Sequence, residues 1–354
     1  MKSDVYFIET KTNDLTSRKS CLLKLLANLQ DNFKYQKDEL VPVKLTIGDS
    51  LCTYNLSPDL VKIVIAQIKA KKANPFLFDT NVIYSGERQN AVDHLTLAQN
   101  KGFAQVKTGA PYIVADGLFG QDGKEFALDS KVIKKIKVPS FIGILESLVV
   151  LSHATGHIVS GYAGAIKNVA MGMVARPTKL TLHSSIKPHT IEDKCTLCKI
   201  CIANCPAGAM EVKAECVVIN PDLCIGCGEC LCACKFNAIF INWSEDADIF
   251  AKRLVDAAQF ILSQFKHRFF INFAFDITKE CDCISDKNDK MLSSDIGILA
   301  SSDPLAIDKA TMDLIDQRQG RLRRERPQGV FTKMFSYAQE KGLGNLEYNL
   351  IKYD

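Results

Sequence analysis

Short apolar runs in this sequence alternate with longer segments in which apolar residues recur every three or four positions. The apolar runs predict strands at Val5–Glu9, Val41–Thr46, Phe76–Asp79, Tyr112–Ala115 and Leu148–Ser152. The periodic segments, such as Cys21–Leu29 and Asp59–Lys71, predict helices between those strands. This alternation is typical of an α/β domain, with a mixed or parallel sheet and crossover helices.

The same pattern resumes toward the end of the chain. Ala251–Phe265 predicts a helix, Phe269–Asp276 a strand, and the stretch 295–315 a strand, a turn and a helix. We therefore expect one α/β domain formed by residues 1–185 and 246–354. An α+β module at 186–245, with halves at about 186–215 and 216–245, is inserted between its two parts.

The inserted segment carries two identical cysteine motifs. Each follows C-x2-C-x2-C-x3-C, and together they comprise Cys195, Cys198, Cys201, Cys205, Cys224, Cys227, Cys230 and Cys234. Matching cysteines are always 29 residues apart, so the module is an internal repeat. The spacing is that of two-cluster bacterial ferredoxins, and it predicts two [4Fe–4S] clusters in a ferredoxin-like module.

The fourth cysteine of each motif in such modules ligates the cluster of the other half. We therefore expect one cluster on Cys195, Cys198, Cys201 and Cys234, and the other on Cys224, Cys227, Cys230 and Cys205. Two zinc sites are the alternative, but zinc favours cysteine pairs separated by a longer spacer. Cys216 and Cys232 occupy no motif position, and we do not expect them to be ligands.

Polar residues and glycines follow the predicted strand Leu148–Ser152. We predict His153, His157 and Lys167 as catalytic residues, and Gly161, Gly164 and Asn168 as residues that bind a cofactor. Open α/β sheets bind ligands beyond the carboxyl ends of their strands, and glycines let the backbone approach an anionic group. On a helix the two histidines would share a face and could bind a metal or relay protons. The alternative is that both are structural.

Asp79 and Asn81 follow another predicted strand, and we predict that they also bind a cofactor. Asp79 is suited to act as a general base or a ligand anchor. The alternative is that Asp79 caps the next helix and that His94 is a solvated helix residue. Asp116 follows a third predicted strand, and it too could either take part in a site or be structural. Cys281 and Cys283 form a C-x-C pair that needs further ligands to hold a metal, and both could be structural.

Composition narrows the classes of function. The 354 residues are 47% hydrophobic and 24% charged, with a net charge of +4, as in soluble globular proteins. The basic run 318–326 is short, so we do not expect nucleic-acid binding. The most apolar stretch, 141–152, is too short to span a membrane, and no secretory signal is visible at the N-terminus. We expect a cytoplasmic protein in a reducing, anaerobic setting.

Four segments together resemble the iron–sulfur protein family catalogued as domain of unknown function 362. They are 79–94 (DTNVIYSGERQNAVDH), 150–168 (VLSHATGHIVSGYAGAIKN), 281–283 (CDC) and 295–310 (DIGILASSDPLAIDKA). The resemblance spans nearly the whole chain and implies a two-cluster ferredoxin unit within an α/β domain. More distantly, HIVSGYAGAIKN is similar to a stretch of the nickel-pincer lactate racemase family. That similarity matches His157 with a proton-transfer histidine and Lys167 with a lysine that contacts the cofactor.

Three functions agree with these features. The first is an oxidoreductase that relays single electrons through two clusters to a substrate or a further cofactor in the α/β domain. The second is a noncatalytic electron-transfer subunit that docks on a partner enzyme, and the third is a protein whose clusters are structural or sense oxygen. The first two imply a redox partner protein, and the first also implies a small anionic ligand.

Overall fold

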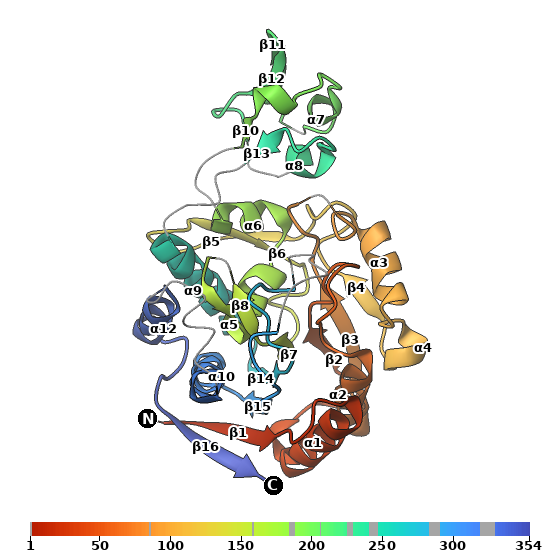
Figure 1. Cartoon of the computed structure of the whole chain (residues 1–354), viewed down its shortest axis with the longest axis vertical. Coiled ribbons are helices and arrows are strands. Elements are labelled where there is room, and N and C mark those ends of the chain that lie inside the picture. Colours follow the sequence, from red (N-terminus) through yellow and green to blue (C-terminus); the bar gives the residue numbers. More distant parts are fainter. Residues whose placement is uncertain are drawn as a thin grey trace.

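The computed structural model describes residues 2–84, 86–157, 159–183, 188–205, 207–224, 229–240, 247–282, 291–318 and 330–354. Within these residues, eight strands form one sheet in the order β16-β1-β15-β14-β7-β2-β3-β4 (Figure 1). The strands are β1 (Ser3–Glu9), β2 (Leu40–Lys44), β3 (Asn74–Asp79), β4 (Tyr112–Val114), β7 (Ser147–His153), β14 (His267–Ala274), β15 (Gly297–Ser301) and β16 (Tyr348–Tyr353).

Most of this sheet is parallel. β14, β7, β2, β3 and β4 run in one direction, and β16 is parallel to β1. β15 is antiparallel to both β1 and β14, which makes the sheet mixed. The strands before and after the cysteine motifs therefore belong to one sheet, and the predicted α/β domain is confirmed.

Helices cover both faces of the sheet. One face packs on α1 (Leu15–Asn28), α2 (Pro58–Ala70) and α3 (Ala91–Asn100), and the other on α5 (Ala165–Gly172), α9 (Ala247–Ser263), α10 (Pro304–Arg318) and α12 (Val330–Glu340). β7 is buried on both sides, with Val149 and Leu151 in one core and Leu148 and Val150 in the other. A strand covered on both faces is apolar throughout, which is why β7 is a continuous apolar run in the sequence.

Two short hairpins lie outside the main sheet. β5 (Lys124–Ala127) pairs with β6 (Lys135–Val138), and β8 (Thr155–His157) pairs with β9 (Gly161–Ala163). The segment after β7 is therefore a hairpin, so His153 and His157 lie on consecutive strands rather than on one helix. Helix α6 (Arg176–His183) follows α5 and ends just before the cysteine motifs.

Residues 188–240 form a small cysteine-rich lobe at one end of the α/β domain (Figure 1). It contains β10 (His189–Thr190), α7 (Ile200–Ala203), β11 (Met210–Lys213), β12 (Cys216–Ile219), α8 (Glu229–Ala233) and β13 (Ile239–Phe240). β10 pairs with β13 and β11 with β12, and the lobe has its own apolar cluster. Of the helices in the described ranges, none has the length and apolarity needed to span a bilayer.

Candidate functional site

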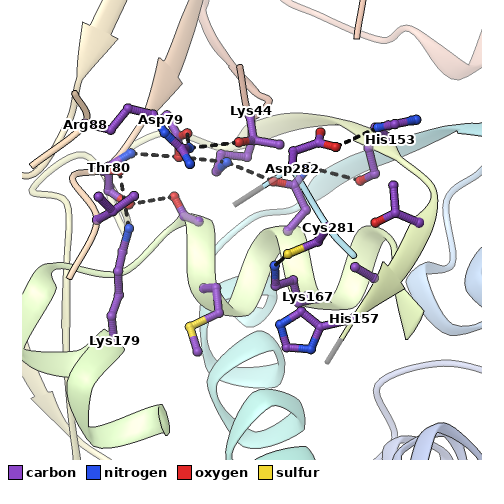
Figure 2. A pocket seen from close by; sticks show the side chains of 18 of the residues that line it. Lys44, Asp79, Thr80, Arg88, His153, His157, Lys167, Lys179, Cys281 and Asp282 are labelled. Carbon is purple, nitrogen blue, oxygen red and sulfur yellow. Dashed lines mark hydrogen bonds and ion pairs between the residues drawn. The ribbon is translucent and has the colours of Figure 1, made fainter. Parts of the chain in front are cut away.

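A cavity of about 530 Å³ lies beyond the carboxyl ends of β2, β3 and β7 (Figure 2). Its polar and ionisable lining residues include Lys44, Asp79, Thr80, Arg88, Ser152, His153, His157, Lys167, Asn168, Lys179, His183, Cys281 and Asp282. These residues come from segments far apart in the sequence, and the parallel strands bring them to one edge of the sheet. This is the edge at which α/β proteins commonly bind ligands.

Lys44, the last residue of β2, is fully buried, and its ammonium group has three acceptors. Its Nζ lies 3.0 Å from Asp79 Oδ1, 2.8 Å from Asn168 Oδ1 and 2.7 Å from the carbonyl oxygen of Leu45. Burial opposes ionisation of Asp79, but Lys44 and the other nearby cations hold the pKa of this carboxyl below its usual value. A charged pair therefore forms one wall of the cavity.

The structural alternatives for Asp79 and His94 are wrong. Asp79 Oδ1 accepts a hydrogen bond from the N–H of Thr80, whereas α3 is capped by the side chain of Asn90. His94 is buried, and its Nε2 lies 3.2 Å from the hydroxyl of Tyr112. Burial lowers the pKa of His94 to about 3, so this histidine is neutral.

Arg88 brings a second buried cation to the same wall. Its Nε lies 2.6 Å from Asp49 Oδ1, its Nη1 lies 3.8 Å from Asp79 Oδ2, and its Nη2 donates to the hydroxyl of Tyr84 at 2.6 Å. Nη1 also donates to the Thr46 hydroxyl at 3.2 Å. The guanidinium is thereby held rigidly, which favours the recognition of a carboxylate or phosphate.

Both ring nitrogens of His153 have acceptors. Nε2 donates to the carbonyl oxygen of Phe275 at 2.7 Å, and Nδ1 lies 2.8 Å from Asp282 Oδ1. Burial opposes the charged ring, but Asp282 and the Phe275 carbonyl raise the pKa of His153 above its usual value. Both ring nitrogens face acceptors, which favours the protonated ring and fixes the position of Asp282.

His157 has a different environment. Its Nδ1 accepts a hydrogen bond from the backbone nitrogen of Ser160 at 3.0 Å and lies 2.9 Å from the Ser160 hydroxyl. Its ring stacks on Phe250 with centroids 5.8 Å apart and an angle of 7° between the planes. An Nδ1 that accepts from the backbone places the proton of the neutral ring on Nε2.

Helix α5 carries Lys167 and Asn168 into the cavity. Lys167 Nζ lies 3.2 Å from Cys281 Sγ, and Asn168 donates to the carbonyl oxygen of Leu151 and the hydroxyl of Ser152. Burial, together with the nearby cations Arg88 and Lys44, lowers the pKa of Lys167 to about 8 against the opposing effect of Asp282. Lys167 can therefore gain or lose a proton near neutral pH.

Two glycines allow α5 to sit this close to the sheet. At Gly164, immediately before the helix, a Cβ would overlap Asp308 Oδ1 and the hydroxyl of Tyr162. At Gly172, the last residue of α5, a Cβ would overlap Cε and Nζ of Lys44. The role of these glycines is thus close packing around charged side chains.

The predicted residues Asn81 and Gly161 do not line the cavity. The amide of Asn81 donates to Asp116 Oδ1 at 3.0 Å and to the Gly117 carbonyl at 2.8 Å. Gly161 has φ of +76° and pairs with His157 in the β8–β9 hairpin. Gly161 therefore forms the turn that orients His157.

Sequence reasoning missed Lys44, Lys179 and His183. Lys179 Nζ donates to the carbonyl oxygen of Thr80 at 3.3 Å, and burial lowers its pKa to about 8 although Asp116 and Asp79 oppose this. Burial and two nearby lysines lower the pKa of His183 to about 3. Lys44 could have been recognised in the sequence, because a lysine inside an apolar strand is unusual. No comparable pattern marks Lys179 and His183 in α6.

The cysteine-rich lobe repeats one contact in its two halves. The backbone nitrogen of Ala209 donates to Cys205 Sγ at 3.3 Å, and that of Ala238 donates to Cys234 Sγ at 3.2 Å. Burial raises the pKa of Cys201, and the neighbouring thiols of Cys234 and Cys198 add to this effect. Backbone N–H groups directed at cysteine sulfur are a feature that tunes iron–sulfur clusters.

Cys227 lies outside the described residues, as do the side chain of Cys232 and all of Cys283. Among the residues the structure describes, no group of three His, Cys, Asp or Glu side chains could hold a single metal ion. Seven of the eight motif cysteines are described, and cysteine sulfur is the donor that binds iron–sulfur clusters, so these residues fit such a cofactor by their chemistry.

The fold and the site define an α/β protein whose sheet is interrupted by a cysteine-rich lobe and whose cavity is lined by buried charges. The chain belongs to the family described as domain of unknown function 362 (DUF362), whose model matches residues 41–313. This confirms the family expected from the sequence.

Shorter segments are similar to named proteins. One is 48% identical over 42 residues to an uncharacterized ferredoxin of Methanocaldococcus jannaschii, covering 12% of this chain and 25% of that protein. Another is 44% identical over 52 residues to the indolepyruvate oxidoreductase subunit IorA of Thermococcus kodakarensis, covering 14% of this chain and 8% of that protein. Each match thus spans a quarter or less of the relative. The lactate racemase apoprotein of Thermoanaerobacterium thermosaccharolyticum is similar in structure, with a TM-score of 0.45 and 12% identity over 88% of this chain and 57% of that one.

Proposed function

We propose that this chain is an iron–sulfur oxidoreductase in which two [4Fe–4S] clusters pass single electrons to a small anionic substrate or cofactor in the cavity. The clusters occupy a ferredoxin-like domain at 186–245, inserted into an α/β domain formed by 1–185 and 246–354. The ferredoxin among its relatives supports an electron-transfer role. When bound, the clusters supply reversible one-electron chemistry.

In each ligand set, three cysteines come from one motif and the fourth comes from the other motif. Cys195, Cys198, Cys201 and Cys234 hold one cluster, and Cys224, Cys227, Cys230 and Cys205 hold the other. Cys201 and Cys234 belong to different motifs but lie in one apolar cluster of the lobe, which supports this assignment. The matching N–H donors to Cys205 and Cys234 support equivalent roles for the fourth cysteine of each motif.

The place where the lobe joins the α/β domain is the observation that carries the proposal. His183 lines the cavity and is the last described residue before the lobe, and Phe250 lies in the first helix after it. The Phe250 ring packs against both His183 and His157, with centroids 5.1 and 5.8 Å apart. His183 and Phe250, described residues on either side of the lobe, therefore lie on or against the cavity lining, which supports electron transfer from the lobe to a bound ligand.

The charge of the lining favours an anionic ligand. Of the described lining residues, Lys44, Arg88, Lys167 and Lys179 are cationic, whereas Asp79 and Asp282 are the carboxylates. His153 faces Asp282, which raises the pKa of this histidine and favours its positively charged form. An excess of buried cations around one cavity attracts an anion such as a carboxylate or phosphate.

Protons accompany the electrons in most reductions of small molecules. Lys167 and His157 are the proton carriers in this proposal, because Lys167 titrates near pH 8 and the His157 ring is neutral with its proton on Nε2. His153 is a positioning residue that orients Asp282. Asp79, Gly164 and Asn168 shape the wall against which the ligand binds.

Anaerobic purification followed by iron and sulfide analysis, EPR and mass spectrometry of retained ligands tests the proposal. We expect two cubane clusters per chain and an anionic ligand. With that ligand as substrate, His157→Ala should abolish turnover and leave the cluster spectrum intact. Fewer than two clusters per chain would contradict the assignment.

The similarity to an oxidoreductase subunit favours a second candidate, a noncatalytic electron-transfer subunit that docks on a redox partner. The His157→Ala variant distinguishes this candidate function from the first. Normal electron transfer from His157→Ala to a partner enzyme, with no turnover by the isolated wild-type chain, would favour the subunit.

A further inference from the structure

Asp282 lines the cavity with a carboxylate of which only one oxygen has a partner among the described residues. Its Oδ1 lies 2.8 Å from His153 Nδ1 (Figure 2). Its Oδ2 is buried and accepts no hydrogen bond from the part of the chain that the structure describes. Of the buried side-chain atoms in this condition within the described ranges, this one alone belongs to a residue that lines the cavity. Buried polar atoms are normally hydrogen-bonded, so this oxygen points to a donor supplied by a ligand.

His153 holds this carboxylate in one orientation. The histidine ring is itself fixed, because its Nε2 lies 2.7 Å from the carbonyl oxygen of Phe275. The side chains of His153 and Asp282 are only 4% and 5% exposed, so neither can turn into solvent. Asp282 therefore keeps Oδ1 on His153 and leaves Oδ2 for a group that enters the cavity.

The cations of the cavity determine which kind of donor can reach Asp282. The negative charge of Asp282 acts on Lys167, where it opposes the fall in pKa that burial causes, so the two groups serve the same part of the cavity. Lys44, Arg88 and Lys179 line the cavity as well. This surplus of positive charge attracts an anion and disfavours an ammonium group on the ligand. The donor that suits Asp282 is therefore an O–H group carried by an anion.

We propose that Asp282 selects small anions that carry an O–H group, by accepting a hydrogen bond from that group at Oδ2. The inference rests on the proposed function, which places an anion in the cavity, and it adds the class of anion. An anion whose oxygens all lack a proton would meet the lone pairs and the negative charge of Asp282 instead, and the two would repel each other. A single proton on the ligand thus decides between attraction and repulsion at this position.

Phosphate and sulfate test the inference, because these tetrahedral oxyanions are similar in size but differ in protonation. Near neutral pH, phosphate keeps at least one O–H group and sulfate keeps none. Sulfate also has the larger mean negative charge, so charge alone favours sulfate in a cationic cavity. Calorimetry on the anaerobic holoprotein, at matched ionic strength, measures both affinities. We expect phosphate to bind more tightly by about tenfold or more, as one hydrogen bond to a charged group provides.

Asp282→Asn keeps the shape of the side chain and changes what it offers the ligand. With the remaining oxygen on His153, the new amide group takes the place of Oδ2 and donates instead of accepting. Loss of the negative charge strengthens the binding of both anions, so the ratio of the two affinities is the quantity to compare. We expect the preference for phosphate to fall by about tenfold or more. Asp256→Asn is the matched control, because Asp256 is a buried carboxylate of α9 that does not line the cavity, and it should keep the wild-type ratio.

Two results would overturn the inference and leave the proposed function intact. One is equal or tighter binding of sulfate by the wild-type chain, and the other is an unchanged ratio in folded Asp282→Asn. The wild-type comparison decides the matter even if the variant does not fold. Binding of neither anion to the wild-type holoprotein would instead contradict the anionic ligand of the proposed function, and this inference with it.

Discussion

Asp308 Oδ1 lies 2.8 Å from the backbone nitrogen of Ala165, so a side chain 143 residues away caps helix α5. Its Oδ2 also accepts from the nitrogen of Ile166 at 2.9 Å, and its Oδ1 accepts from the amide of Asn272 at 2.8 Å. These contacts anchor the helix that carries Lys167 to strand β14 and helix α10.

Asp308→Ala should therefore lower the free energy of unfolding by about 2–4 kcal/mol, because it removes a helix cap and leaves buried donors unpaired. Urea denaturation measures the change. Asp14→Ala is the matched control, since Asp14 caps α1 through an exposed hydrogen bond to Ser17. We expect a smaller loss there. Equal losses in both variants would contradict a buried anchoring role for Asp308.

Gly172 allows Lys44 to lie against α5. Gly172→Ala would place a methyl group on Cε and Nζ of Lys44 and force the ammonium away from Asp79. We expect a loss of about 2 kcal/mol in unfolding free energy from overpacking. We also expect weaker binding of sulfate, used as a probe anion, in calorimetry. In Gly86→Ala the new Cβ would meet only the Tyr84 ring, at 3.8 Å. This variant should change neither the unfolding free energy nor the binding of sulfate. Unaltered sulfate binding in Gly172→Ala would show that Lys44 does not shape the site.

The sheet was predictable because its strands are local apolar runs, as in Val149 and Leu151 of β7. The site was only partly predictable. His153 and Asp79 are the last residues of their strands, so position along the chain was informative. Lys179 reaches the cavity from a helix, and Asp308 acts from the far end of the chain. Their contacts depend on the packing of α6 and α10, which no local pattern encodes.

Arg18 joins two carboxylates that lie far from it in the sequence. It makes paired hydrogen bonds to Asp276 and to Asp295, at 2.6 to 2.9 Å. Asp295 is 1% exposed in its side chain, so Arg18→Ala leaves a buried carboxylate without its partner. The expected loss of unfolding free energy is about 3 kcal/mol, measured by urea denaturation. The next residue provides the control, because the Lys19–Asp59 pair is exposed at 3.7 Å and Lys19→Ala should cost less than about 1 kcal/mol.

Anion binding should weaken in alkaline solution. Burial lowers the pKa of Lys167 and of Lys179 to about 8, so both lose their positive charge as the pH rises through 8. Above pH 8, each lysine that must regain a proton when sulfate binds lowers the affinity for sulfate by about tenfold per pH unit. Lys167→Met should make the decline with pH shallower, whereas Lys135→Met, at an exposed ion pair on β6, should not. An affinity that is constant from pH 7 to 10 would contradict the role of these lysines.

Because each expected cluster takes ligands from both motifs, the assignment predicts which cysteine substitutions should have the same effect on the EPR spectrum. Cys201 and Cys234 belong to different motifs but to one expected cluster, so Cys201→Ser and Cys234→Ser should perturb the same EPR signal of the reduced protein. Cys205→Ser should perturb the other signal, although Cys205 lies only four residues from Cys201 in the sequence. Cys216→Ser is the control, because Cys216 is buried in the lobe but lies outside both motifs. If Cys201→Ser instead resembled Cys205→Ser, each motif would hold its own cluster, and the closeness of Cys201 to Cys234 would reflect packing alone.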